Sequence, residues 1–285
     1  MFNTKYTLIT GASEGFGKAL ALECASRKMN LILVALPGPE VYYLANFIKR
    51  NYIVDVVAIE KDLSIEENCL SVFKLVKDLQ LSVNMLINDT GLGSTMLFSE
   101  GDIAFYQKQI KLNIIATTML THLFLDMLRL NGPSHILNVG SLSSYFFLPK
   151  KQVYAATKSF IYFFTKCLRK ELNQNEISIS VICPGSMNTN ISVIRLLKTS
   201  GCISRSSVMN PEDVAPIAIN GLLNGREVII PGKINKLFLL MNILIPSLIK
   251  KKIIGRQMKK IKSVTLLESK QQIILFTEKQ NSLSA

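Results

Sequence analysis

Tyr154 and Lys158 are the two residues of this 285-residue chain whose types and spacing point most directly to chemistry. They are four positions apart, so on a helix both side chains project from one face. A tyrosine hydroxyl ionises near a pKa of ~10, and a neighbouring ammonium group favours the phenolate and lowers that pKa. Tyr154 would then give a proton to a carbonyl oxygen or remove one from an alcohol. Ser141, at the end of an apolar run, would hydrogen-bond the same oxygen and stabilise its developing charge.

A glycine-rich turn near the start of the chain is suited to hold the phosphates of a dinucleotide. The sequence Thr10-Gly11-Ala12-Ser13-Glu14-Gly15-Phe16-Gly17 follows an apolar strand and leads into a helical pattern. Gly11 lets the chain turn without a Cβ clash, Gly15 lets the backbone approach a pyrophosphate, and Gly17 lets helix and strand pack closely. The N-terminus of the helix would present free N–H groups and its positive dipole end to the phosphates.

The elements that must position these residues alternate between strand-length apolar runs and longer amphipathic segments. Seven strands are predicted, at Tyr6–Thr10, Leu31–Ala35, Val54–Ile59, Val83–Asn88, His135–Gly140, Ile177–Cys183 and Glu227–Ile230. Helical periodicity is found in Phe16–Arg27, Glu66–Leu79, Ile103–Leu130, Tyr154–Leu172 and a segment that starts at Pro211. The alternation predicts an α/β fold, a single Rossmann-type doubly wound domain with a seven-stranded parallel sheet. Ligands of such sheets bind at the carboxyl ends of the strands.

The order of these motifs along the chain resembles that of the short-chain dehydrogenase/reductase family, over about residues 4 to 232. The glycine spacing G-x3-G-x-G matches that family. So do Asp62-Leu63 after the third strand, Asn88-Asp89-Thr90-Gly91 after the fourth, and Pro184-Gly185-Ser186-Met187-Asn188-Thr189 after the sixth. The full catalytic set that the resemblance implies is Asn113, Ser141, Tyr154 and Lys158.

The resemblance also implies roles for individual residues. Asp62 would contact the adenine, Lys158 the nicotinamide ribose, and Asn113 would hold a water that links Lys158 to solvent. The implied cofactor-binding residues are Gly11, Ser13, Gly15, Phe16, Gly17, Asp62, Asn88, Tyr154, Lys158 and Thr189.

Two departures from the family pattern bear on the cofactor. Asp89 and Thr90 replace the Asn and Ala of the usual Asn-Asn-Ala-Gly, which places an extra acid near the cleft with no evident donor partner. At the end of the second strand, Ala35 and Leu36 stand where an acid would bind the ribose hydroxyls and select NAD. An arginine that would welcome a 2′-phosphate is missing there too. Because the excluding acid is absent, NADP(H) is favoured over NAD(H).

Composition excludes several other classes of protein. Five scattered cysteines without a CxxC spacing and two unclustered histidines predict neither a disulfide framework nor a metal site. The polar start of the chain predicts no signal peptide, so the expected location is cytoplasmic. The net charge of +13 is concentrated in nine basic residues between Lys233 and Lys262, which lack the interleaved aromatics of a nucleic-acid binder. No nucleic-acid partner is therefore expected.

Residues 233–285 form a predicted C-terminal extension to a catalytic domain of residues 1–232. It begins with an apolar segment, Leu237–Ile249, followed by Lys250-Lys251-Lys252. Thirteen residues, almost all apolar, are too few to span a bilayer, which takes ~20 on a helix. Three roles remain open: a helix covering an apolar substrate cleft, peripheral contact with an anionic membrane, or a subunit interface of a homo-oligomer.

The function expected from these residues is hydride transfer between NAD(P)(H) and a carbonyl or alcohol group. The extension resembles those of hydroxysteroid dehydrogenases and 3-ketoacyl reductases, which implies a small apolar carbonyl or alcohol substrate. The alternative is a non-catalytic NAD(P)(H)-binding sensor or scaffold of the same fold. Intact Tyr154, Lys158, Ser141 and Asn113 favour the enzyme, whereas Asp89 leaves room for the alternative.

Overall fold

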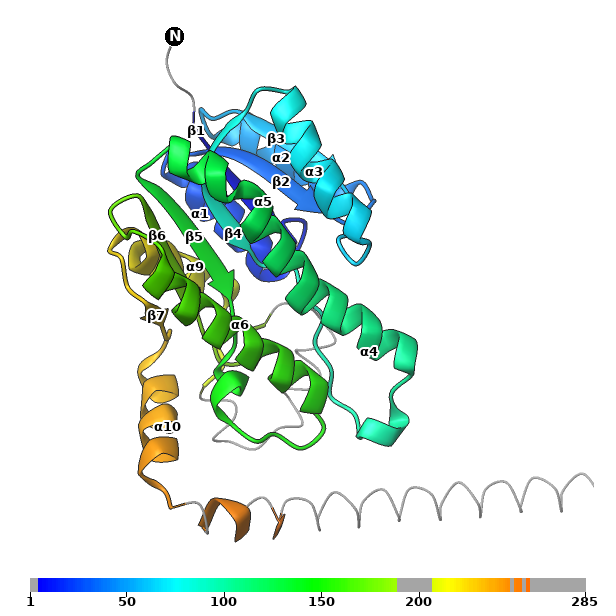
Figure 1. Cartoon of the computed structure of the whole chain (residues 1–285), viewed down its shortest axis with the longest axis vertical. Helices are drawn as coiled ribbons and strands as arrows, with labels where there is room; N and C mark the ends of the chain where they lie inside the picture. The colour runs from blue at the N-terminus through cyan, green and yellow to red at the C-terminus, as the bar shows by residue number, and fades with distance from the viewer. Residues whose placement is uncertain (1–4, 189–206, 247–248, 253–254, 257–285) are drawn as a thin grey trace, which may run out of the picture. The chain divides into compact units, whose positions relative to one another are not determined.

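The seven apolar runs form one parallel sheet in the computed structural model, which describes residues 5–188, 207–246, 249–252 and 255–256 (Figure 1). The strands are β1 (Lys5–Thr10), β2 (Asn30–Ala35), β3 (Val56–Glu60), β4 (Ser82–Asn88), β5 (Ser134–Val139), β6 (Ile177–Ile182) and β7 (Val228–Ile229). Their spatial order is β3-β2-β1-β4-β5-β6-β7, and every pairing is parallel. The order therefore reverses between β1 and β4, where a doubly wound sheet binds its ligand.

Helices cover both faces of the sheet because the strands are apolar on both sides. On one face α1 (Gly15–Ser26), α2 (Glu40–Asn51) and α9 (Pro211–Leu223) pack against alternate strand residues such as Ile9 and Leu33. On the other, α3 (Glu66–Asp78) and α5 (Thr117–Leu130) pack against Leu8 and Ile32, and α6 (Gln152–Glu171) packs against β6. Figure 1 shows α5 and α6 running across the near face of the sheet. The predicted α/β fold is confirmed.

The long segment predicted as one helix over Ile103–Leu130 is helical throughout but not uniform. It consists of α4 (Ile103–Ile110), a π-helical stretch η2 (Lys111–Ala116) and α5. A π-helical turn inserts an extra residue into the i→i−4 ladder and is common at functional sites. Asn113 lies in this stretch, so the irregular geometry falls on a residue assigned to the site by the sequence.

A buried polar network ties the centre of the sheet to α5 and α6. The Asn88 side-chain amide donates to Asn138 Oδ1 at 2.8 Å and to Thr121 Oγ1 at 3.1 Å. Asn138 in turn donates to Thr165 Oγ1 at 2.9 Å. Buried amides without partners would cost free energy, and these bonds offset part of that cost while fixing β4, β5 and the two helices in one arrangement.

The chain divides into two compact units, Met1–Leu239 and Leu240–Ala285. Helix α10 (Lys233–Leu244) begins at the predicted start of the extension, and its first turns belong to the first unit. Asn235 of this helix is buried, and its amide donates to the Pro231 carbonyl at 2.9 Å. Within the described ranges, no helix is both long and apolar enough to cross a bilayer.

Candidate active site

Tyr154, Ser141 and Lys158 meet at the carboxyl edge of the sheet. Tyr154 and Lys158 lie one turn apart on α6, and Ser141 closely follows β5, before the short 3-10 helix η3 (Leu142–Tyr145). The Ser141 side chain lies close enough to Tyr154 to lower the pKa of the tyrosine by hydrogen bonding. Lys158 is buried, and its Nζ donates to the Val139 carbonyl, the last of β5, at 2.7 Å. The three side chains predicted to act on one oxygen are thus brought together.

The acidity of Tyr154 differs from the expectation drawn from its spacing to Lys158. Burial raises the pKa of its hydroxyl, and electrostatic interactions with Asp89 and Cys183 raise it further. The hydrogen bond with Ser141 lowers it. The protein groups by themselves therefore raise this pKa, because desolvation outweighs the contact with Ser141. The lowering expected from Lys158 together with the positive nicotinamide of the oxidised cofactor stays a prediction.

The surroundings of Lys158 have opposing effects on the pKa of its ammonium group. Burial lowers the pKa of its ammonium group, while Asp89 and Cys183 raise it. Asp89, for which the sequence offered no partner, therefore faces the buried end of Lys158. Cys183, at the end of β6, is also close enough to interact with both Lys158 and Tyr154. Sequence reasoning did not assign this cysteine to the site, although its position at a strand end could have indicated it.

Asn113 joins the loop after β4 to the helix that carries the catalytic pair. Its Oδ1 accepts from the Leu92 N–H at 2.7 Å, and its Nδ2 donates to the Leu92 carbonyl at 3.1 Å and to Thr157 Oγ1 at 2.9 Å. Both amide hydrogens are therefore engaged by protein groups next to Lys158. The observed contacts tie the loop after β4 to Thr157, next to Lys158, and the water-holding role stays a prediction.

The glycine turn after β1 combines left-handed backbone angles with close packing of main chains. Gly11 and Gly15 have φ angles of +70° and +52°, a region that favours glycine. A Cβ on Gly17 would collide with the main chain of Gly11, so only glycine permits this packing. Glu14, at the N-cap of α1, makes no side-chain capping bond, which leaves the first N–H groups without that partner. These features fit a bound pyrophosphate.

The other residues predicted to bind the cofactor, in this turn and elsewhere, differ in what their side chains contact. Ser13 lies in the turn and is partly exposed. Phe16 is buried in the core beneath α1, so only its main chain faces the turn. The Asn88 amide is committed to the buried network described above. Thr189 lies outside the described residues.

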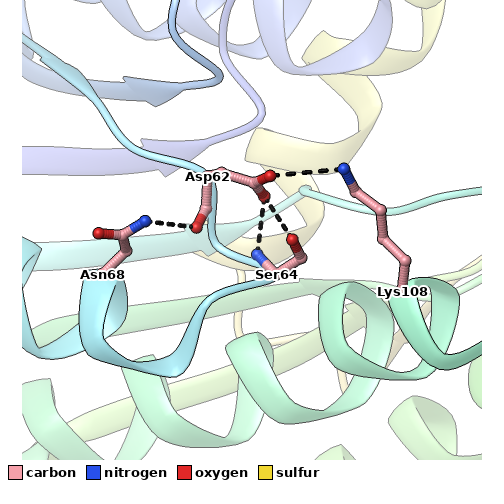
Figure 2. A network of polar contacts seen from close by, with 4 residues as sticks. All are labelled: Asp62, Ser64, Asn68 and Lys108. Atoms are coloured by element: carbon pink, nitrogen blue, oxygen red, sulfur yellow. Dashed lines mark hydrogen bonds and ion pairs between the residues drawn. The ribbon is translucent and has the colours of Figure 1, made fainter. Parts of the chain in front are cut away.

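Asp62 lies after β3 in a small polar network (Figure 2). Its Oδ1 accepts from the Ser64 N–H at 2.9 Å and from the Ser64 hydroxyl at 2.7 Å, and its Oδ2 accepts from Lys108 Nζ at 3.4 Å. Asn68 donates to the Asp62 main-chain carbonyl at 2.9 Å. Although burial alone would raise it, the pKa of the carboxyl is lowered by Ser64 and Lys108. Asp62 is therefore held in one orientation as an ionised acceptor.

An acid that the sequence did not reveal lies beside the loop after β2. Glu60, the last residue of β3, accepts a hydrogen bond from the Gly38 N–H at 2.9 Å through its Oε1. Parallel pairing places Glu60 opposite Ala35. Glu60 could have been found from its position, because it ends the strand next to β2 and the carboxyl ends of parallel strands meet at one edge of the sheet.

Comparison with known proteins places this site in a family. Residues 5–195 match the short chain dehydrogenase family. The NADP-dependent 3-hydroxy acid dehydrogenase of Schizosaccharomyces pombe is 31% identical over 232 residues, covering 79% of this chain and 90% of the relative. Human 17-beta-hydroxysteroid dehydrogenase type 3 is 26% identical over 224 residues, covering 76% of this chain and 69% of the relative.

The fold is also found in a solved structure. The bulky-bulky ketone specific alcohol dehydrogenase of Comamonas testosteroni aligns with a TM-score of 0.71 at 24% identity, covering 91% of this chain and 94% of the other. The family match extends over more than half of the chain and includes the glycine turn, Ser141, Tyr154 and Lys158. The chain therefore belongs to the short-chain dehydrogenase/reductase family of nicotinamide-dependent oxidoreductases.

Proposed function

We propose that this protein transfers a hydride between NADP(H) and a carbonyl or alcohol group of an apolar substrate, with Tyr154 as general acid and base. The observation that carries the proposal is the meeting of Tyr154, Ser141 and Lys158 at the sheet edge, next to a glycine turn built for phosphates. When bound, the nicotinamide supplies or accepts the hydride.

The protein groups divide the remaining work. The Ser141 hydroxyl and the Tyr154 hydroxyl converge, so a substrate oxygen between them would accept two hydrogen bonds. Tyr154 then gives its proton to that oxygen in reduction and removes it in oxidation. The Lys158 ammonium group donates one hydrogen bond to the Val139 carbonyl and has further N–H groups beside the tyrosine. We assign to it the role of hydrogen-bonding the nicotinamide ribose. Asn113 positions this part of α6 through Thr157.

The assignment of NADP(H) rests on the loop after β2. Ala35 and the exposed Leu36 offer no carboxylate against a 2′-phosphate. The similar protein of Schizosaccharomyces pombe is named as NADP-dependent. Glu60 acts in the opposite direction, because its hydrogen bond to the Gly38 N–H holds a carboxylate beside this loop, where its charge would repel a 2′-phosphate. We therefore expect a preference for NADPH that is modest in size and that increases in Glu60→Gln.

An apolar substrate is supported by the segment between Ser141 and Tyr154. This loop carries Phe146-Phe147-Leu148, and the Phe147 side chain is 83% exposed. An exposed aromatic side chain in a loop that joins two site residues is suited to contact an apolar ligand. The similar human protein named as a hydroxysteroid dehydrogenase is in keeping with such a substrate, whereas the name of the Schizosaccharomyces pombe protein specifies a 3-hydroxy acid, which carries a charge.

A panel assay tests the proposal and separates it from a non-catalytic binding protein. Oxidation of NADPH and NADH would be followed with aliphatic, aromatic and steroid carbonyls, with cofactor binding measured in parallel by calorimetry. Turnover of an apolar carbonyl, faster with NADPH, is the expected result. Tight cofactor binding without turnover of any carbonyl or of the matching alcohols would support the sensor or scaffold instead.

A further inference from the structure

Gly93, in the loop after β4, is a glycine that the packing of the chain does not require. Its φ lies outside the left-handed region, so the backbone does not demand glycine there. Apart from its chain neighbours, a Cβ on Gly93 would meet one atom of the described residues within 4 Å, Tyr154 Cε2 at 4.0 Å, an ordinary van der Waals contact. Glycine loses more conformational freedom on folding than any other residue, so it costs stability where a side chain would fit. Another reason for this glycine is needed.

The loop that contains Gly93 passes along both members of the Tyr154–Lys158 pair. Cε2 is the ring carbon next to the one that bears the tyrosine hydroxyl, so the exposed Gly93 lies beside the reactive end of the ring. Two residues earlier, a Cβ on Gly91 would lie 3.4 Å from Lys158 Nζ and 3.1 Å from Asn113 Oδ1. Packing therefore favours glycine beside the lysine, whereas beside the tyrosine the missing side chain leaves space.

Hydrogen bonds hold this loop on both sides of Gly93. The Leu92 N–H donates to Asn113 Oδ1 at 2.7 Å. The Leu92 carbonyl accepts from Asn113 Nδ2 at 3.1 Å and from Gln109 Nε2 at 2.8 Å. The fully buried Gln109 also donates to Ser94 Oγ at 3.3 Å. Since both neighbours of Gly93 are anchored to the helical segment below them, the loop is held away from Tyr154 and the space beside the ring is kept open.

The same loop is tied to the segment that leads into α6. The Met96 N–H donates to the Lys150 carbonyl at 2.9 Å. Lys150 follows the stretch that carries Phe147, whose side chain is 83% exposed. Two connected segments thus flank Tyr154 in the chain, one with an exposed apolar side chain and one with no side chain beside the ring. This combination suits an apolar group larger than a methyl.

We propose that Gly93 determines substrate specificity, because its missing side chain makes room beside Tyr154 for a branched or cyclic apolar group on the substrate carbonyl. The inference rests on the proposed role of Tyr154. The substrate oxygen must reach the tyrosine hydroxyl, so a group attached to the carbonyl carbon on this side lies next to Gly93. A side chain at this position would fill that space and restrict the substrates to small aldehydes and ketones.

The test compares a bulky and a small carbonyl in Gly93→Ala and Gly93→Val. The kcat/KM for NADPH-dependent reduction would be measured with cyclohexyl phenyl ketone and with butanal, and their ratio is the selectivity. Valine should lower the selectivity by ~10² and alanine by ~10, because steric exclusion acts on the larger substrate. Thr95→Val is the matched control, since Thr95 is exposed in the same loop and its hydroxyl donates to the adjacent Ser94 carbonyl at 2.9 Å. The control should leave the selectivity unchanged.

An unchanged selectivity in Gly93→Val, or an equal loss for both substrates, would overturn the proposal. If the valine variant does not fold, the alanine variant decides by the same criterion. Calorimetric binding of the ketone to the NADPH complex gives a readout without turnover. Binding that is present in the wild type and lost in Gly93→Val, in a protein that reduces no carbonyl, would uphold the role of Gly93 and refute the proposed function. The two failures are therefore distinguishable.

Discussion

At the scale of single residues, the site balances groups that favour the phenol of Tyr154 against groups that favour its phenolate. Burial, Asp89 and Cys183 raise the pKa of Tyr154, and hydrogen bonding with Ser141 lowers it. A general acid must hold its proton until the carbonyl oxygen takes it, so a raised pKa suits reduction better than oxidation. The protein groups alone thus favour the reductive direction at neutral pH.

Ser141→Ala removes the hydroxyl that interacts with Tyr154. We expect kcat to fall by ~10²–10³, because a donor to the developing oxyanion is lost. The pKa of Tyr154 should rise, since the hydrogen bond with Ser141 lowers it, and the rising limb of alcohol oxidation should move to higher pH. A pH profile of kcat/KM measures both effects. Ser143→Ala is the matched control, because its buried hydroxyl has no hydrogen-bond partner among the described residues.

Asp89 also predicts how stability depends on pH. Its pKa is about 7 in the folded chain and 3.8 as a free side chain, so between these values the folded state holds a proton that the unfolded state has lost. The free energy of unfolding therefore falls as pH rises through this window, by at most about 1.4 kcal/mol per unit. An asparagine at this position carries no such proton, so the variant lacks this dependence.

Urea unfolding of the wild type and Asp89→Asn at several pH values provides the measurement. The variant should gain stability relative to the wild type between pH of about 4 and 7 and show no further relative gain above it. If the free energies of unfolding of the two proteins changed with pH in parallel over that range, Asp89 would have the same pKa in the folded and the unfolded chain, which would contradict this prediction.

At the scale of elements, the turn between β1 and α1 depends on a close approach of main chains. A Cβ on Gly17 would lie 2.7 Å from the Gly11 carbonyl carbon and 2.8 Å from Asp89 Oδ2, closer than atoms can pack. Gly17→Ala must displace the turn, so we expect a loss of ~1–3 kcal/mol of stability and a large loss of cofactor affinity. Gly93→Ala is the control, because its Cβ would meet its nearest neighbour, Tyr154 Cε2, at 4.0 Å. Equal cofactor affinity in the two variants would contradict this account of the turn.

Most elements could be predicted because their signals are local. Each strand is an apolar run bounded by turn residues, and α9 begins with a proline and two acids in its first turn, as expected. The π-helical stretch at Asn113 could not be predicted, since one extra residue in a helical ladder leaves the apolar pattern nearly unchanged. It depends on packing between α4 and its neighbours, which no local pattern records.

The residues of the site were predictable where they follow strand ends in sequence order. Tyr154, Ser141 and the glycines were found in this way. The electrostatic interaction of Asp89 with Lys158 and the hydrogen bond of Glu60 with Gly38 were not, because both join residues far apart in sequence. That burial raises the pKa of Tyr154 could not be predicted, since spacing reveals a neighbouring charge but not the depth of burial.

At the scale of the whole molecule, the C-terminal extension remains without an assigned partner. Leu237, Leu240, Met241, Ile243 and Leu244 of α10 expose large apolar side chains. Lys250, Lys251 and Lys252 follow them in the sequence. Three roles stay predictions for this segment: a lid over the substrate cleft, peripheral contact with an anionic membrane surface, and a homo-oligomer interface.

Vesicle sedimentation at low and high salt separates these roles. The full chain should bind anionic vesicles but not neutral ones, and replacing Lys250, Lys251 and Lys252 by glutamine should weaken binding by roughly a hundredfold, at ~1 kcal/mol for each lysine. Absence of binding at low salt would exclude membrane contact. Light scattering on the same samples would then show whether the chain is a dimer, as an interface requires, or a monomer, as a lid permits.

The central claim is that Tyr154 exchanges the proton that accompanies hydride transfer, and Tyr154→Phe tests it most directly. The variant keeps the ring and loses only the hydroxyl, so cofactor affinity measured by calorimetry should stay within about twofold of the wild type. With the best carbonyl substrate of the panel, kcat should fall by ~10²–10⁴, the usual contribution of general acid catalysis. A variant that binds the cofactor normally and retains more than about a tenth of the wild-type kcat would contradict the account.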